Sequence, residues 1–319
     1  MDALHLYTHP ACLDHRPGPT HAERPARLQA VTAAIDAAFP ELRWRHAPRA
    51  SRSQLLRVHD DALLGLVLDT DIGADDAPSA LDPDTVLGFG SAEAALRAAG
   101  AGIAAVDAVM TGDAHRAFCA VRPPGHHATG SIAMGFCLFN NIAVAAAHAC
   151  ERHGLTRIAI VDFDVHHGNG TQAIFQSDPR VMYLSSHQSP LYPDSGRADE
   201  RGVGNVLNLP LPPGTASADF RAAWRRQLLP ALDGFRPQLL LISAGFDAHR
   251  LDPLAQVELD ADDYRWLTSQ LAATADRHAG GRLVSMLEGG YDLTALRESS
   301  VAHVGALLQP PLPRATTPT

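Results

Sequence analysis

Carboxylates and imidazoles that can bind a metal ion lie at residues 162–170, which read Asp-Phe-Asp-Val-His-His-Gly-Asn-Gly. Side chains two positions apart in an extended segment point the same way, so Asp162, Asp164 and His166 share one face. A third ligand is available from Asp247, which follows another apolar run. Three protein ligands and one open position are typical of catalytic zinc, and this donor set leaves iron(II) and cobalt(II) as alternatives.

Two adjacent histidines, His126 and His127, follow a Pro-Pro-Gly turn. An isolated His-His pair is more often structural, but beside a metal one imidazole can take a proton from water and pass it to a leaving amine. Asp162 can orient one of these imidazoles, because the metal does not need it as a ligand. Tyr291 follows two glycines and can donate its hydroxyl to a developing oxyanion. Together these residues indicate a metal-assisted hydrolase.

These groups meet only if the elements before them form a parallel sheet. Short apolar runs alternate with Ala- and Leu-rich helical patterns, which is typical of βαβ units with helices on both faces of the sheet. In such a sheet the ligand site lies beyond the carboxyl ends of the strands, where the polar residues of this chain follow each run. We predict strands over residues 117–121, 157–162, 181–185, 238–243 and 282–287.

Helical patterns and long loops fill the remaining sequence. We predict helices over residues 25–39, 91–110, 140–153, 219–233 and 262–278, with Ser91 as an N-cap and Gly154 and Gly280 after last turns. Segments 71–84 and 186–211 are rich in Gly, Pro, Asp and Ser and are predicted to be functional or mobile loops. No linker interrupts the pattern, so we predict one domain over 1–308 and a Pro/Thr-rich tail over 309–319.

Composition narrows the function classes. The 26 basic and 35 acidic residues give a net charge of −9, which argues against a general nucleic-acid or membrane-surface binder. No run of about 18 apolar residues and no signal-like N-terminus is present, so we expect a cytoplasmic protein. The four cysteines show no CxxC or disulfide spacing, as expected of reduced thiols; they are Cys12, Cys119, Cys137 and Cys150.

The chain resembles the histone deacetylases, in particular their class II branch and its bacterial relatives. The motifs that carry the resemblance are RPPGHHA at 122–128, GFCLFNN at 135–141, DFDVHHGNGTQ at 162–172 and SAGFDAH at 243–249. They lie within a match that runs from HAERPARL at 21–28 to EGGYDL at 288–293. The resemblance implies an arginase/deacetylase-like α/β domain with about eight mostly parallel strands.

The resemblance also implies roles for the residues described above. Asp164, His166 and Asp247 match the zinc ligands, and Tyr291 matches the transition-state tyrosine. His127 matches the general base and acid, and His126 supports it electrostatically. The residues that face the two histidines also match, with Asp162 as the partner of His126 and Asn169 as the partner of His127. Class I members place an aspartate at the position of Asn169, so this amide marks the class II branch.

Substrate and ion sites are implied in the same way. The positions that match the family's substrate tunnel and its rim are Gly135, Phe136, Tyr192, Leu254 and Gly290, although Phe136 and Leu254 could equally be core residues. Arg27 matches an arginine of the cavity below the zinc. Two potassium sites are implied, mostly through backbone groups: one at Asp162, Asp164, His166, Ser185 and Ser186, the other at Phe175, Asp178 and Val181. Asp82 and Asp84 are not assigned to the family's carboxylate contact with the substrate backbone.

The implied substrate is an acylated lysine peptide or protein, and three other functions stay open. Ureohydrolases share the fold but bind two manganese ions through an Asp-x-His-x-Asp arm; Gly168 stands where that last aspartate would be, which favours one metal. An acetylpolyamine amidohydrolase is the runner-up, weakened because Leu254 stands where some such enzymes place a glutamate. The remaining alternative is a metal-stabilised binding module without activity. An oligomer is compatible with each of these functions.

Overall fold

The computed structural model describes residues 2–74 and 76–310. Its centre is an eight-stranded sheet of order β2-β1-β5-β10-β9-β6-β7-β8. Each neighbouring pair in this sheet is parallel. The strands are β1 (Asp2–Thr8), β2 (Trp44–His46), β5 (Ala114–Cys119), β6 (Ile158–Asp162), β7 (Val181–Gln188), β8 (Val206–Leu211), β9 (Leu239–Ala244) and β10 (Leu283–Leu287). A separate two-stranded antiparallel ladder joins β3 (Ser79–Ala80) to β4 (Val86–Leu87).

Strand register brings the polar residues of the central strands to one edge. The strands β6, β9 and β10 are buried along their whole length, as expected of parallel strands covered on both faces. Asp162, the last residue of β6, lies opposite Ser185 of β7 and Ser243 of β9. The segments that follow these strands therefore leave the sheet side by side, which is the arrangement that the sequence predicts.

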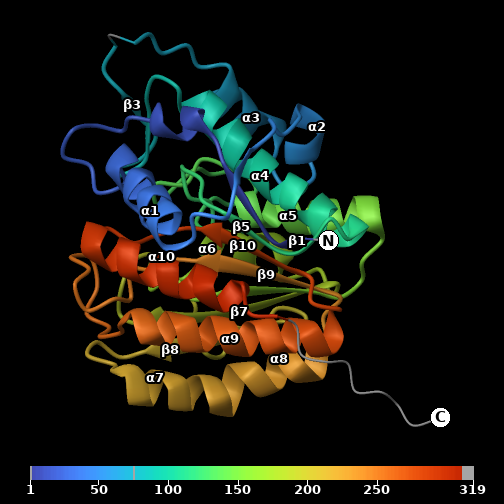
Figure 1. Cartoon of the computed structure of the whole chain (residues 1–319). Helices are drawn as coiled ribbons and strands as arrows, with labels where there is room; N and C mark the ends of the chain where they lie inside the picture. The colour runs from blue at the N-terminus through green and yellow to red at the C-terminus, as the bar shows by residue number, and fades with distance from the viewer. Residues whose placement is uncertain (1, 75, 311–319) are drawn as a thin grey trace.

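Helices cover both faces of the sheet (Figure 1). The helices α4 and α5 lie above it in this view, and α8 and α9 lie below it. The α-helices are α1 (Pro25–Ala38), α2 (Arg52–Leu55), α3 (Asp61–Leu68), α4 (Ser91–Thr111), α5 (Asn141–His153), α6 (Asn169–Phe175), α7 (Ser217–Ala223), α8 (Leu229–Phe235), α9 (Ala261–His278) and α10 (Leu293–Leu307). A 3₁₀ turn, η1 (Pro10–Leu13), precedes α1, and a π-helical turn, η2 (Trp224–Leu228), joins α7 to α8.

The five predicted strands and five predicted helices are present, with ends shifted by a few residues. The helix predicted over 219–233 is interrupted by η2. The sequence analysis missed β1, β2 and β8 as strands. The strand β8 lies inside the loop predicted over 186–211 from its Gly, Pro, Asp and Ser content. It contains Pro210, which an edge strand can accommodate.

The helix ends correct one prediction and confirm another. Ser91 is the first residue of α4 and not its N-cap, which is Gly90 at φ 78°. The Ser91 hydroxyl instead accepts a hydrogen bond from the Gly88 amide and contacts His15 Nδ1 at 2.7 Å. Gly154 ends α5 in the left-handed conformation, as predicted.

Among the described residues, α4 is the one helix long and apolar enough to pass a test for membrane-spanning segments, and 67% of its apolar stretch is buried inside the fold. It packs against α5, β1 and β5, so its apolar character is explained by the core. Most of the predicted tail, residues 311–319, lies outside the described residues, and the boundary at 308 stays a prediction.

Candidate active site

Three side chains from two strand ends meet at the carboxyl edge of the sheet. His166 Nδ1 lies 3.1 Å from Asp164 Oδ1 and 3.1 Å from Asp247 Oδ2, and all three residues are buried. One ligand atom from each lies within 4.8 Å of the other two. Asp164 and His166 follow β6 and Asp247 follows β9, which are hydrogen-bonded neighbours. The donor set, two carboxylates and one imidazole, fits a divalent ion of zinc type with one position left open.

The two carboxylates are held by backbone amides and lack a cationic side chain of lysine or arginine at salt-bridge distance among the described residues. The Gly289 amide donates to Asp164 Oδ2 at 2.8 Å, and the Val165 amide donates to Asp247 Oδ1 at 2.8 Å. A Cβ at position 289 would lie 2.0 Å from Asp247 Oδ2, so only glycine lets the chain pass this close. Burial and the charge of Asp164 raise the pKa of Asp247 to about 7. A cation bound between the two carboxylates would favour their charged forms.

The tandem histidines differ in their partners. His126 Nδ1 lies 3.0 Å from Asp162 Oδ2, whereas His127 Nδ1 lies 2.8 Å from Asn169 Oδ1. The two rings are adjacent, with centroids 4.1 Å apart. An imidazole that donates through Nδ1 keeps the lone pair of Nε2 free. The geometry thus leaves Nε2 of His127 available to a substrate in the cavity.

The surroundings shift the pKa values of His126 and His127 in opposite directions. Burial disfavours the charged form of His126, but the charges of Asp164 and Asp162 outweigh it and raise its pKa well above the ordinary value. Burial and the neighbouring rings of His126 and His166 hold the pKa of His127 well below the ordinary value. The two pKa values are thus shifted in opposite directions, so His127 is more readily neutral than His126, which suits a base beside an electrostatic support.

Buried groups that sequence reasoning missed hold the His126-His127 loop. The Glu288 carboxylate accepts hydrogen bonds from the amides of Gly125 and His126, at 2.7 and 3.2 Å, and from the Ser243 hydroxyl at 3.0 Å. The Asn140 side chain donates to the Ala128 carbonyl at 3.0 Å. Glu288 had a sequence signal, since it directly follows a predicted strand, but its acceptor role depends on three-dimensional contacts.

His59 supports this loop from a distant part of the chain. Its Nε2 accepts a hydrogen bond from the Asn140 amide, and its Nδ1 donates to the Thr129 carbonyl, both at 2.9 Å. Burial lowers the pKa of His59 to about 4, so the ring is neutral and can accept through Nε2. No sequence motif marks this residue, because its partners lie 70 and 81 positions away.

A cavity of about 250 Å³ opens beside the metal-ligand set, at His166. Its lining includes the predicted residues Gly135, Phe136, Tyr192, Leu254 and Tyr291, together with His127 and His166. It also includes Asp84 and Leu191, which the sequence analysis left unassigned. Edge-to-face contacts pack Tyr192 on His127 and Tyr291 on Phe136, with ring centroids 5.2 and 5.8 Å apart. The cavity walls are therefore mostly aromatic or apolar.

Gly290 is absent from this lining, although it was predicted to bind substrate. Its carbonyl accepts a hydrogen bond from Arg27 Nε at 2.5 Å instead, because the chain turns away from the cavity there at φ 117°. The Arg27 guanidinium also lies over the Tyr291 ring, 4.8 Å from its centroid. Arg27 is fully buried and pairs with Glu23, so it supports the floor of the site.

The first predicted potassium site has the features that a monovalent ion needs. Asp162 and Ser185 are paired neighbours in the sheet, next to the metal-binding arm. The Ser186 hydroxyl is buried and makes no hydrogen bond with the described residues. An unpaired buried polar atom is costly unless an ion or water satisfies it. The residues present thus fit a cation at this position.

The second predicted potassium site does not fit an ion in the same way. The carbonyls of Phe175, Asp178 and Val181 do converge, but on Nδ2 of Asn205, at 2.7, 3.0 and 2.8 Å. An amide nitrogen thus takes the place that the prediction gives to potassium. The prediction overlooked Asn205 because it follows Gly204 in a segment assigned to a loop.

Gly168 leaves no space for the extra carboxylate that a second metal ion would require. A Cβ at this position would lie 2.6 Å from Tyr183 Oη and closer still to Asp162 Oδ2. The further carboxylate of a two-metal arm therefore has no room here. Within the described residues, the other group with metal-ligand geometry is Asp107, His148 and His153, which is separate from the cavity.

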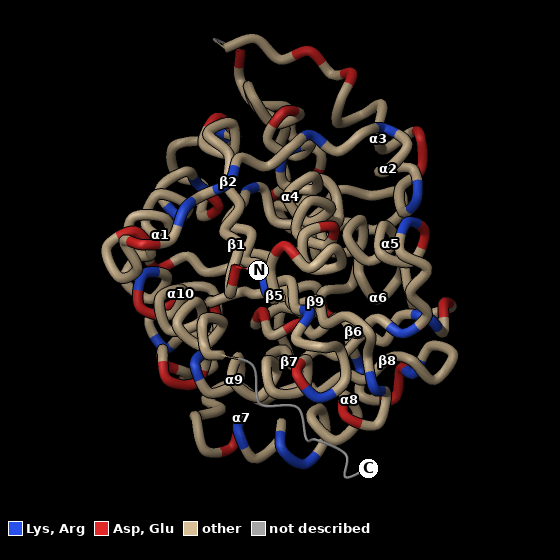
Figure 2. The backbone as a smooth tube through the Cα atoms, turned by 45° about the vertical axis from the view of Figure 1, so that its right-hand side comes forward, with Lys and Arg blue, Asp and Glu red and all other residues tan. Residues whose placement is uncertain are grey.

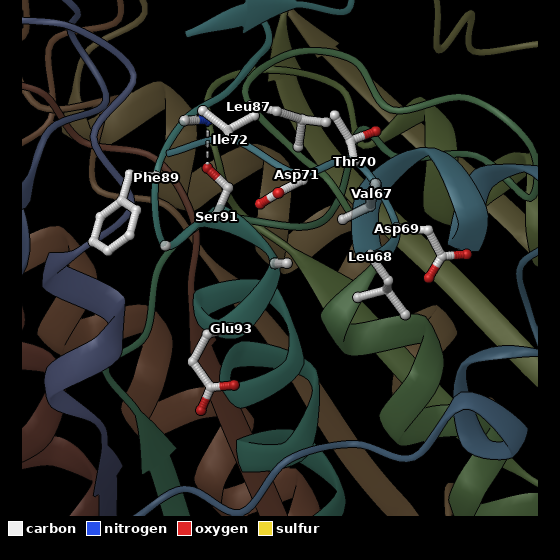
Figure 3. A pocket seen from close by; sticks show the side chains of 13 residues that line it. Val67, Leu68, Asp69, Thr70, Asp71, Ile72, Leu87, Phe89, Ser91 and Glu93 are labelled. Carbon is white, nitrogen blue, oxygen red and sulfur yellow. Dashed lines mark hydrogen bonds between the residues drawn. The ribbon is translucent and has the colours of Figure 1, made fainter. Parts of the chain in front are cut away.

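Neither the charge distribution nor the hollow beside α3 and α4 suggests a different catalytic site. Figure 2 shows Arg positions interspersed with Asp and Glu along the chain, without a basic stripe over one element. A hollow of about 320 Å³ lies between the end of α3 and the start of α4 (Figure 3). Its side chains include Asp69, Asp71 and Glu93, but none of the residues discussed above as catalytic. The chemistry therefore gathers at the cavity beside Asp164, His166 and Asp247.

Comparisons with known proteins agree with this geometry. A family model described as the histone deacetylase domain matches residues 21–307. The histone deacetylase-like amidohydrolase of Pseudomonas aeruginosa is 45% identical over 278 residues, which cover 85% of this chain and 72% of that protein. Polyamine deacetylase HDAC10 of Homo sapiens is 40% identical over 318 residues, which cover 93% of this chain and 46% of that protein. The crystal structure of the HDA15 HD domain matches with a TM-score of 0.90 at 36% identity, covering 96% of this chain and 88% of that one.

The eight-stranded parallel sheet with helices on both faces and a ligand-bearing edge defines a single-domain α/β protein of the arginase/deacetylase type. Within this class, the chain belongs to the histone deacetylase family. The family resemblance of the sequence motifs is thus confirmed, and the chain is an amide-hydrolysing deacetylase.

Proposed function

We propose that the chain is a zinc-dependent amidohydrolase that removes acetyl or other acyl groups from the ε-amine of lysine in proteins or peptides. The observation that carries the proposal is that the group Asp164, His166 and Asp247 adjoins, through His166, a cavity with aromatic and apolar walls. A lysine side chain is long, unbranched and apolar along its stem, so it suits such a cavity. Zinc, when bound, supplies Lewis-acid polarisation of the acyl carbonyl and acidifies a water molecule.

The protein's own residues supply the proton transfers and the orientation. His127, neutral and fixed by Asn169 at 2.8 Å, accepts the proton of the attacking water and returns it to the leaving amine. His126, paired with Asp162, contributes positive charge beside the reacting atoms. Tyr291, at the cavity wall, donates its hydroxyl to the developing oxyanion.

Two accessory features belong to the proposal. We propose one structural potassium ion near Ser185 and Ser186, supported by the unpaired Ser186 hydroxyl. We also propose a cytoplasmic location, supported by four free and buried cysteines, which are Cys12, Cys119, Cys137 and Cys150.

An acetylpolyamine is the alternative substrate, and one observation favours it. Asp84 lines the cavity with Leu254, and burial together with contact to Asp82 raises the pKa of Asp84. A carboxylate at the wall attracts a second ammonium group of the substrate, which a polyamine carries. The relative named polyamine deacetylase HDAC10 gives the same suggestion.

A substrate panel tests the proposal. Acetyl-, longer acyl- and trifluoroacetyl-lysine peptides are compared with acetylated polyamines by their kcat/KM. All 26 basic residues of the chain are arginine, so no lysine of the enzyme can carry an acyl group that contributes background. A kcat/KM that is highest for lysine peptides supports the proposal. A higher value for acetylpolyamines supports the alternative, and absence of turnover on every amide would contradict both.

A further inference from the structure

A second cluster of metal-binding side chains joins α4 to α5. Asp107 Oδ1 lies 2.8 Å from His148 Nε2 and 2.7 Å from His153 Nε2. The ligand atoms lie within 4.8 Å of one another, and the two imidazole rings are 5.6 Å apart in an edge-to-face arrangement. Asp107 is 47% exposed and His153 17% exposed, so an ion can reach the cluster from solvent.

We infer that Asp107, His148 and His153 form a second site for a divalent transition-metal ion of zinc type. Two imidazole nitrogens and one carboxylate oxygen are donors that zinc prefers, and they leave a fourth position for water. The nitrogen-to-oxygen separations of 2.8 and 2.7 Å are hydrogen-bond distances, and ligands on one tetrahedral zinc ion, with bonds of about 2.0–2.1 Å, lie about 3.3 Å apart. A small outward movement of the exposed Asp107 carboxylate makes room for the ion.

The backbone around the cluster favours a cation. His153 is the last residue of α5, and Asp107 lies four residues before the end of α4. The carboxyl ends of helices carry partial negative charge, which stabilises positive charge nearby. Of the three ligands, His153 lies in the last turn of α5 and can receive this stabilisation, whereas Asp107 lies a full turn before the end of α4.

The neighbouring Arg57 weakens metal binding at this cluster. Arg57 Nη1 lies 3.0 Å from His148 Nδ1, and a guanidinium can only donate. Since Nδ1 accepts this hydrogen bond, the proton of neutral His148 lies on Nε2. A metal ion bound beside Asp107 needs the lone pair of that same Nε2 atom. Metal binding therefore requires the ring to move its proton to Nδ1 and the exposed Arg57 side chain to turn away.

The site lies far from the cavity. The helix α5 starts beside Asn140, which holds the catalytic loop, and its 13 residues span about 20 Å to His153. An ion at the far end cross-links α4 and α5 without touching the reacting atoms. Its effect is therefore on the stability of the fold and not on the chemical step, because an ion that binds only the folded state stabilises it.

Zinc titration of the intact protein with its catalytic metal bound tests the inference. The wild-type chain is expected to take up one further zinc equivalent per chain, measured by calorimetry and elemental analysis, with a rise in melting temperature. The variants His153→Ala and Asp107→Asn, both at partly exposed positions, are expected to lose that equivalent and the rise. The variant Arg57→Ala is expected to bind the second zinc with a lower Kd.

The matched control is His278→Ala, which removes a histidine from another His-Asp pair, with Asp233 at 2.8 Å. This variant should keep the second equivalent. The inference is overturned if wild type binds no further zinc, or if His153→Ala and Asp107→Asn bind it as wild type does. Deacetylase activity and the catalytic metal, assayed in the same samples, report on the proposed function separately.

Discussion

The imidazole of His127 is oriented by a neutral amide, because its Nδ1 lies 2.8 Å from Oδ1 of Asn169. The adjacent His126 faces the Asp162 carboxylate at 3.0 Å instead. An amide fixes the tautomer of a ring without adding negative charge, so it does not raise the pKa of that ring as a carboxylate does. The pair thus divides two tasks, orientation and charge, between its partners.

Replacing the amide by a carboxylate tests this division. In Asn169→Asp the added charge raises the pKa of His127, so the ring becomes protonated at a higher pH than in wild type. The acidic limb of kcat/KM against pH is expected to move to higher pH, since a protonated ring cannot act as the base. Asn169→Ala serves as a control, because it removes the orientation without adding charge. An unchanged acidic limb in Asn169→Asp would rule out His127 as the base.

Tyr291→Phe removes one hydroxyl from the cavity wall. The expected loss in kcat is about 10²–10³-fold, the scale of losing one oxyanion donor. Tyr192→Phe is the matched control, since Tyr192 lines the same cavity and its ring packs on His127. Its loss should be much smaller. Equal activities of Tyr291→Phe and wild type would contradict the assigned role.

Removal of the metal should affect both activity and stability. Without a cation the carboxylates of Asp164 and Asp247 face each other in a buried site. Exposure to a chelator is expected to abolish turnover and to lower the free energy of unfolding by about 3–5 kcal/mol, the cost of an uncompensated buried charge. Added zinc should restore both. Full activity in a sample with no detectable metal would sink the zinc proposal.

The buried ring of His59 predicts acid sensitivity of the fold. Its pKa is lowered from 6.5 to about 4 in the folded state, so the unfolded chain binds the proton first as pH falls. The stability that this ring contributes is complete above pH 6.5 and is lost as pH falls from 6.5 to about 4. The loss amounts to about 3 kcal/mol, at 1.36 kcal/mol per pKa unit.

His59→Gln isolates that contribution, because an amide can replace both hydrogen bonds and does not titrate. Denaturant unfolding between pH 7.5 and 4 should show a shallower decline for the variant than for wild type. Parallel declines would show that His59 does not titrate as expected. His303, a buried ring with its pKa lowered to about 3, remains in both proteins and cancels in the comparison.

Asn205 takes the place that the sequence assigned to a second potassium ion. In Asn205→Ala three converging carbonyls lose their donor, so the melting temperature should fall in choline chloride. Potassium chloride is expected to restore part of the loss in the variant and to have a smaller effect on wild type. The same response of both proteins to potassium would show that the amide does not substitute for the ion.

The sequence motifs identified most of the proposed catalytic residues. The residues that hold them in place became visible only in the structure. The pair Asp164 and His166 could be predicted from residue types and their position after a buried strand. The extended geometry expected for residues 162–166 was wrong, because β6 ends at Asp162 and residues 164–166 form a bend. Buried strands such as β6 and β10 were also recognisable, since they are short apolar runs with polar residues after them.

The residues that hold the site in place could not be predicted, because each acts through a contact between distant segments. His59 and Asn205 lie outside the family motifs, and Glu288, which opens EGGYDL, binds backbone amides 162 and 163 positions away. The strand β8 lies in a segment whose Gly, Pro, Asp and Ser content predicted a loop, and it contains Pro210, which its edge position permits. Gly290 was assigned to substrate binding from the family resemblance, yet its carbonyl accepts a hydrogen bond from Arg27.

The crowding around Gly168 also bears on how this scaffold can diversify. Any side chain introduced there would push against Tyr183 and Asp162, which sit on two adjacent strands. A single codon change to aspartate would thus damage the support of His126 before it created a second ligand arm. In this chain, a second metal-binding carboxylate at position 168 would therefore also require replacements at the residues that crowd it.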